Sequence, residues 1–172
     1  MKSKMNLLIK IATQLYIFTA VSPIVIIFLI KKESYFCAFS LFVFAFVYSN
    51  WFLNRCLKKF GDESVECDFV EIAEPKFIPI YITYFVVALS VNNDNILLFW
   101  IIFLGIFILI QGCKFSFFNP FALLKFNFYE ANTKNNTGAN YRLFLISKRN
   151  IKNIDKISNL IRLNNFTFFT KG

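Results

Sequence analysis

The sequence of 172 residues contains no histidine, only five glycines and four prolines, and ten acidic residues. Without histidine, the usual zinc-binding spacings and the commonest general base are missing. No glycine-rich phosphate loop appears, and no serine lies in a nucleophile-elbow context. Ser147 and Lys148 are neighbours, but adjacent residues of a strand point to opposite faces. We therefore expect no catalytic site, no metal site and no cofactor.

Apolar residues are abundant instead, at 57% of the chain with 25 phenylalanines. A soluble domain of this size could not bury so much apolar surface. The chain has four long runs of residues without charge. A helix of that length crosses a lipid bilayer, although the third run is short and contains Pro79. The sequence thus predicts an α-helical membrane protein with four transmembrane helices, at about 9–30, 34–54, 77–93 and 95–113. The first run is too long for a cleaved signal peptide and is expected to be retained.

Basic residues are distributed unevenly around the four runs. All 19 except Lys31 and Lys32 precede the first run, separate the second from the third, or follow the fourth. Short loops rich in Lys and Arg stay in the cytoplasm. We therefore expect a multi-pass protein of the bacterial inner membrane, with both termini and the loop 55–76 cytoplasmic. Lys31 and Lys32 can extend to the lipid headgroups.

More than half of the acidic residues lie in the loop 55–76. Clustered charges steer encounter and select partners, so we interpret these residues as a docking site for a basic protein. A solvated loop, or pairing with the basic tail, would also explain the cluster. The residues are Asp62, Glu63, Glu66, Asp68, Glu71 and Glu74.

The same loop has two possible local structures. Val65, Cys67 and Phe69 alternate with polar residues, as in a strand, with a slip of phase at Val70 that indicates a bulge. A helix starting at Asp62 and ending before Pro75 is the alternative. The sequence leaves the choice open.

The tail, residues 114–172, predicts a small cytosolic α+β domain after the break at Asn119-Pro120, and residues 1–113 form the transmembrane domain. Alternation near 126–128 and 141–145 predicts a hairpin around the turn at 134–138. Apolar residues at three- and four-residue steps in 151–161 predict an amphipathic helix, and 164–172 a closing strand. The order is β-β-α-β. A tail of this size needs support from the membrane, another subunit or the acidic loop.

Four basic residues of the tail are predicted to contact anionic lipids: Lys148, Arg149, Lys152 and Lys156. No aromatic stacking platform is evident, so direct nucleic-acid binding is not expected. The four apolar runs contain no charged residue in their interior, whereas coupled transporters bury one there. A small transporter or pore is thus a weaker hypothesis than a general membrane anchor or assembly factor.

Four close-set apolar runs, an acidic loop, and NPFALLKFNFYEAN followed by YRLFLISKR after the last run together resemble the KwaA family, the membrane subunits of the two-gene Kiwa anti-phage defence systems. The resemblance is sharpest in residues 119–149. It implies a membrane homo-oligomer, a tetramer, that responds to phage at the envelope. It also implies a sensor and scaffold that holds a cytosolic DNA-binding effector, KwaB. No contact residue follows from the resemblance.

Overall fold

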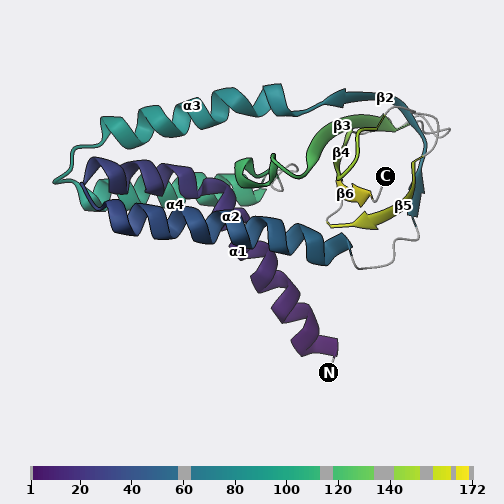
Figure 1. The fold of residues 1–172 in the computed structure, drawn as a ribbon, viewed down its shortest axis with the longest axis horizontal. Coiled ribbons are helices and arrows are strands. Elements are labelled where there is room, and N and C mark those ends of the chain that lie inside the picture. The colour runs from purple at the N-terminus through teal and green to yellow at the C-terminus, as the bar shows by residue number, and fades with distance from the viewer. Residues whose placement is uncertain are drawn as a thin grey trace.

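The long apolar runs form helices, in which each backbone satisfies its own hydrogen bonds. The computed structural model describes residues 2–57, 63–112, 118–133, 142–151, 157–163 and 166–170. Within them, helices gather at one end of the molecule and strands at the other (Figure 1). The helices are α1 (Lys2–Lys31), α2 (Tyr35–Leu57), α3 (Glu74–Ser90) and α4 (Ile96–Gly112), with a 3-10 turn η1 (Pro120–Ala122).

Two of the four helices are long and apolar enough to cross a membrane, namely Ile11–Lys31 within α1 and Tyr35–Arg55 within α2. Each of α3 and α4 has 17 residues, about 25 Å of helix against a hydrocarbon layer of about 30 Å. Helix α3 starts three residues before the predicted run, with Pro75 in its first turn. The structure thus supports two of the four predicted spans by length and composition.

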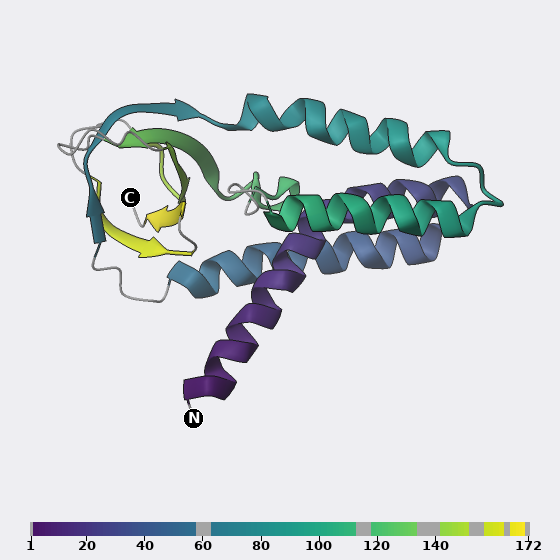
Figure 2. The ribbon, with the colours of Figure 1, turned by 180° about the vertical axis from the view of Figure 1, so that it is seen from behind.

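Helix α1 is the centre of the bundle and packs against α2, α3 and α4. Seen from behind, α4 lies in front of α1 and α3 runs above them, while the N-terminal turns of α1 project out of the bundle (Figure 2). At the end far from the sheet, the Lys31 ammonium donates to Leu89 O and Val91 O, both at 2.6 Å. A cation at the last carbonyls of α3 is favoured by the helix dipole.

The strands form one six-stranded sheet in the order β1-β5-β6-β4-β3-β2. All neighbours are antiparallel except β4 and β6, which are parallel. The strands are β1 (Glu63–Val65), β2 (Cys67–Ile72), β3 (Asn127–Thr133), β4 (Arg142–Ser147), β5 (Ile157–Arg162) and β6 (Thr167–Thr170). The acidic loop therefore forms strands, and it joins the same sheet as the tail.

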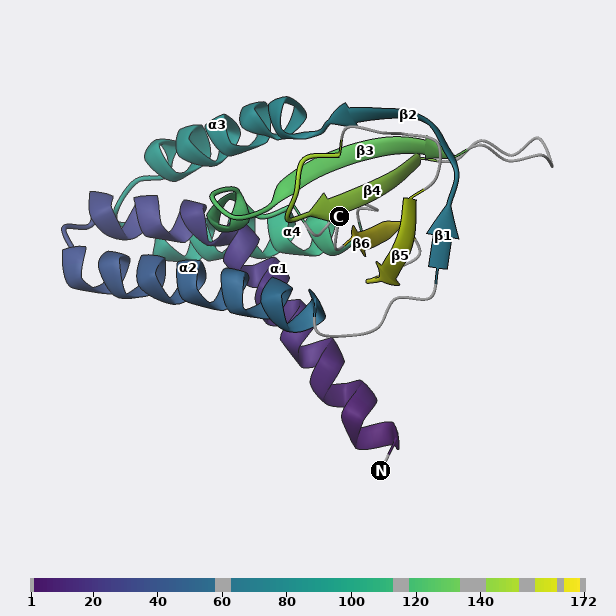
Figure 3. The ribbon, with the colours of Figure 1, turned by 45° about the vertical axis from the view of Figure 1, so that its right-hand side comes forward.

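Strands β1 and β2 lie at opposite edges of this sheet, yet Glu66 alone separates them. Val65 pairs with Ile157 of β5, and Cys67 with Thr133 of β3. A sheet whose two edges are one stretch of chain must curl round on itself. Figure 1 shows the strands as a ring, and Figure 3 shows the bend of the chain from β1 into β2. Curling in this way protects edges that would otherwise recruit foreign strands.

Both faces of the central strands are buried, because the sheet has a different core on each side. Tyr129, Leu145 and Phe168 point into the ring with Leu160 and Cys67. Residues of the alternate phase point outward, onto the ends of the helices. Strands β4 and β6 are accordingly buried along almost their whole length.

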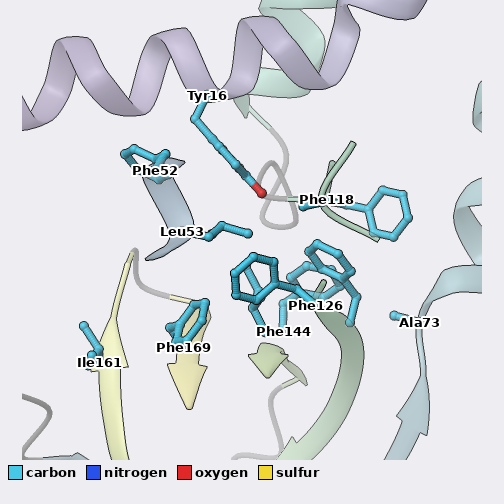
Figure 4. Close-up of a cluster of buried hydrophobic side chains, with 12 residues drawn as sticks. Tyr16, Phe52, Leu53, Ala73, Phe118, Phe126, Phe144, Ile161 and Phe169 are labelled. Carbon is cyan, nitrogen blue, oxygen red and sulfur yellow. The ribbon is translucent and has the colours of Figure 1, made fainter. Parts of the chain in front are cut away.

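The side chains that point outward from the ring pack against residues of the helices and form a second hydrophobic core (Figure 4). We call this core, between the helices and the sheet, the joint. Tyr16 stacks on Phe52 at a centroid distance of 4.8 Å, and both lie over the side chains of the sheet. Phe118, which follows α4, stacks on Phe77 of α3 at 3.9 Å and lies 4.8 Å from Phe128 of β3. Aromatic rings from α1, α2, α3 and the sheet thus form one core.

The predicted hairpin and closing strand of the tail are confirmed, as β3 with β4 and as β6. The predicted helix is wrong where the structure describes it, because residues 157–162 form β5. Leu160 points into the ring and Ile161 points toward the helices. Apolar residues that are buried on opposite faces of one strand thus gave the same spacing in the sequence as the apolar face of a helix. Residues 152–156 and the predicted turn at 134–138 lie outside the described residues.

Candidate docking site and its ion cluster

The six acidic residues nominated from the sequence are spread along the segment that closes the sheet. Glu63 begins β1, Asp68 lies in β2, and Asp62 is outside the described residues. Glu66, between β1 and β2, is exposed and takes part in none of the ion pairs found in the described ranges. The register of β2 shifts between Cys67 and Phe69, just ahead of the slip indicated by the sequence.

Glu71 belongs to a cluster of four charges. It lies opposite Glu130 in the pairing of β2 with β3. Lys76, in the first turn of α3, donates to both carboxylates. Arg142 of β4 donates to Glu130 Oε1 at 3.1 Å. The cluster therefore ties the acidic loop to the tail, through Lys76 of the loop and Glu130 of the tail. None of the ion pairs found in the described ranges joins a loop acid to a basic residue of the tail.

Glu130 is the centre of the cluster, with its side chain only 10% exposed. Burial alone would raise the pKa of Glu130, but the hydrogen bonds and charges of Lys76 and then Arg142 outweigh it and lower the pKa. The hydrogen bonds to Glu130 and to Glu71 raise the pKa of Lys76 in turn. Glu130 and Lys76 thus hold each other in their charged forms.

Glu74 has a local role at the start of α3. Its Oε1 accepts a hydrogen bond from Phe128 N at 3.5 Å, while Ala73 N donates to Phe128 O at 2.9 Å. These bonds continue the β2–β3 pairing into the helix. Among the nominated acids whose side chains the structure describes, Glu66 is therefore the one that is exposed and takes part in none of these ion pairs and hydrogen bonds.

Exposed side chains beside Glu66 and Glu71 include one large aromatic residue. Phe69 is 51% exposed. It lies two residues from Glu71 in β2, on the same face of the strand. We call Glu66, Phe69 and Glu71 the docking patch. An exposed aromatic anchor between carboxylates is suited to a basic protein surface.

The nominated lipid-contact residues divide between described and undescribed parts. Lys148 and Arg149 follow β4 and are exposed. They lie beside the beginning of β3, because Ser147 pairs with Asn127. Ser147 Oγ donates to Arg149 O at 2.7 Å and fixes this turn. Lys152 and Lys156 lie outside the described residues.

Sequence reasoning missed three polar residues that the fold brings into use. Glu130 and Arg142 were not linked to the acidic loop, because only the pairing of β2 with β3 brings them there. Asn119 was seen as a chain break, yet it is fully buried among α1 and α2. In the described part of the chain, no group of three metal-binding side chains lies together.

Comparison with known families decides the relationship. The family model described as "Anti-phage protein KwaA" matches residues 12–169. The chain belongs to the KwaA family. The match includes α2, α3, α4, strands β1 to β5 and β6 as far as Phe169, so the helices and the sheet belong together to this anti-phage protein. No curated protein and no solved structure matches the KwaA chain.

Proposed function

We propose that this KwaA chain is the membrane-embedded sensor and scaffold subunit of an anti-phage defence complex, and that its curled sheet docks a cytosolic DNA-binding effector. The observation that carries the proposal is the shared sheet. The acidic loop and the basic tail build one body at one end of an apolar bundle. That body carries exposed charged side chains, among them Glu66, Arg142 and Arg149, and the docking patch lies on it.

Placement of the chain in the inner membrane, with four spans and both termini cytoplasmic, has two supports. The outer faces of α3 and α4 expose aliphatic side chains such as Ile82, Leu97 and Leu109, as a surface in contact with lipid does. Lys31, which opposed the sidedness rule, has its ammonium bound by two carbonyls of the chain itself. Its charge is thus partly satisfied within the protein.

A basic partner would be recognised by the docking patch in two ways. Carboxylates at the rim would accelerate encounter, and the ring of Phe69 would supply the apolar contact that holds the complex. A DNA-binding effector would be a basic partner of this kind, because the surface of a DNA-binding protein carries positive charge. The sensor role has a physical basis as well, since helix packing responds to bilayer thickness.

Recovery of the effector from mildly solubilised membranes tests the docking proposal. Phe69→Ala is expected to reduce recovery about tenfold, as loss of an interface anchor does. Glu66→Lys is expected to reduce recovery most strongly at low salt. Asp94→Lys, at the opposite end of the bundle, is the matched control and should leave recovery unchanged.

Glu71→Lys is less informative, since it also breaks the ion cluster and mixes docking with folding. Unchanged recovery with both Phe69→Ala and Glu66→Lys would remove the docking patch from the proposal. Protection of cells against phage by both variants at the wild-type level would do the same.

A further inference from the structure

Three polar side chains meet inside the apolar joint, and each is fully buried. They are Thr19 of α1, Ser49 of α2 and Asn119, which follows α4. The Asn119 amide donates to Thr19 Oγ1 and to Ser49 Oγ, both at 2.9 Å. Its oxygen accepts a hydrogen bond from Phe121 N at 3.0 Å. One side chain thus connects two helices with the segment that leads into the sheet.

Asn119 is the donor in both bonds, because an amide nitrogen carries two protons and does not accept. The hydroxyl of Thr19 lies 2.7 Å from Tyr16 O and that of Ser49 lies 2.6 Å from Ala45 O, while the two hydroxyl oxygens lie 2.9 Å from each other. The two hydroxyls supply one proton each to these three contacts, and both of their oxygens accept from the Asn119 amide. A hydrophobic or anionic side chain at position 119 could not supply the two donors.

The neighbours of Asn119 extend this connection to the sheet. Phe118 packs on Phe77 of α3 and on Phe128 of β3. On the other side, Asn50 of α2 donates to Phe121 O at 3.0 Å, while its own Oδ1 is buried with no partner in the described structure. Asn50 thus joins α2 to the backbone of the η1 segment, next to the bonds that Asn119 makes.

We propose that Asn119 is the positioning residue that couples the packing of α1 against α2, and with it the bilayer thickness, to the state of the cytosolic sheet. The trigger rests on the proposed sensor function. The coupling itself rests on the hydrogen bonds of Asn119 and the rings of Phe118 and Phe128. When α1 and α2 move apart, Thr19 and Ser49 can no longer share the Asn119 amide, and the segment before β3 is released.

The reactivity of Cys67 reports on the sheet, because this thiol is buried inside the ring and far along the strands from Asn119. The full chain, with Cys37, Cys56 and Cys113 replaced by alanine, would be reconstituted in vesicles of dimyristoleoyl or dierucoyl phosphatidylcholine. Labelling of Cys67 by a membrane-permeant maleimide is then followed with time. We expect labelling to differ about tenfold between thin and thick bilayers, an ordinary strength of coupling between sites.

Asn119→Asp keeps the shape of the side chain but removes its donors, so the dependence on bilayer thickness should disappear. The double variant Thr19→Val with Ser49→Ala removes both acceptors and keeps Asn119, and it should behave in the same way if Asn119→Asp folds poorly. Tyr48→Phe is the control. It deletes another hydrogen bond between α2 and α1, from Tyr48 Oη to Ala12 O, and should keep the dependence.

Two results would overturn the coupling. One is a rate of Cys67 labelling that is the same in thin and thick bilayers when the joint is unaltered. The other is a dependence on thickness in the Asn119→Asp and Thr19→Val/Ser49→Ala variants that equals the dependence in the unaltered protein. The assay contains neither phage nor effector. Loss of the docking proposal therefore leaves this result intact. The reverse outcome, docking without thickness-dependent labelling, would remove Asn119 as the coupling residue and leave the scaffold role in place.

Discussion

Glu71 lies directly opposite Glu130 in the antiparallel pairing of β2 with β3. Like charges facing each other across strands destabilise a sheet. Here the Lys76 ammonium donates to both carboxylates and turns a repulsion into a link. The link joins two segments of the chain that are separated by α3 and α4. It therefore helps to decide which strand closes the sheet.

Replacement of Lys76 by methionine should expose the repulsion. The side chain of Lys76 is 46% exposed, so solvent screens its ion pairs and each contributes at most about 1 kcal/mol. Loss of both, with Glu130 left nearly buried, predicts a destabilisation of about 1–2 kcal/mol. The measurement is the thermal midpoint in detergent. Lys125→Met, another exposed lysine, should leave the midpoint unchanged.

Stability should depend on pH through Glu130. Because its pKa is lowered in the folded protein, the unfolded chain binds more protons in acid, and folding is stabilised as pH rises. The contribution is present above the ordinary glutamate pKa and is lost as pH falls through the lower pKa of the folded state. The thermal midpoint should therefore fall below about pH 4. Glu130→Gln should show a shallower fall, and an identical profile would refute the assignment.

Helices and most strands of this KwaA chain could be predicted, because their signals are local. Runs without charge are long, and the alternation around Phe128 and Leu145 has the period of a strand. The secondary structure of the acidic loop was ambiguous, because a proline such as Pro75 can follow the end of one helix or lie in the first turn of another. In the structure Pro75 lies in the first turn of α3.

The remaining features depend on contacts that the sequence does not encode locally. Strand β5 resembled a helix because Leu160 and Ile161 are buried in different cores. The position of Asn119 between Thr19 and Ser49 joins residues 100 and 70 positions apart. The curled topology follows from pairing partners for β1 and β2 that lie far along the chain.

The turn between α1 and α2 offers a test of backbone strain. Glu33 has φ of 61°, in the left-handed region that side chains rarely adopt. Its N–H donates to Ile30 O at 2.9 Å, which closes the end of α1. Glu33→Gly should raise the stability by up to about 1 kcal/mol, as glycine is favoured at this position. Glu33→Ala retains the strain and should give no gain in the same thermal assay.

Sidedness is the claim on which the docking proposal depends. Cys67 is unsuited to test it, because the rate at which its buried thiol reacts depends on the opening of the sheet as well as on the side from which the reagent comes. Two exposed positions at opposite ends of the molecule can test it. In a chain without its natural cysteines, Glu66→Cys and Asp94→Cys would be treated in spheroplasts with a maleimide that cannot cross the bilayer. We predict labelling at Asp94→Cys at once, and at Glu66→Cys only after the membrane is permeabilised. Labelling of Glu66→Cys in intact spheroplasts would place the sheet outside the cell and contradict the account.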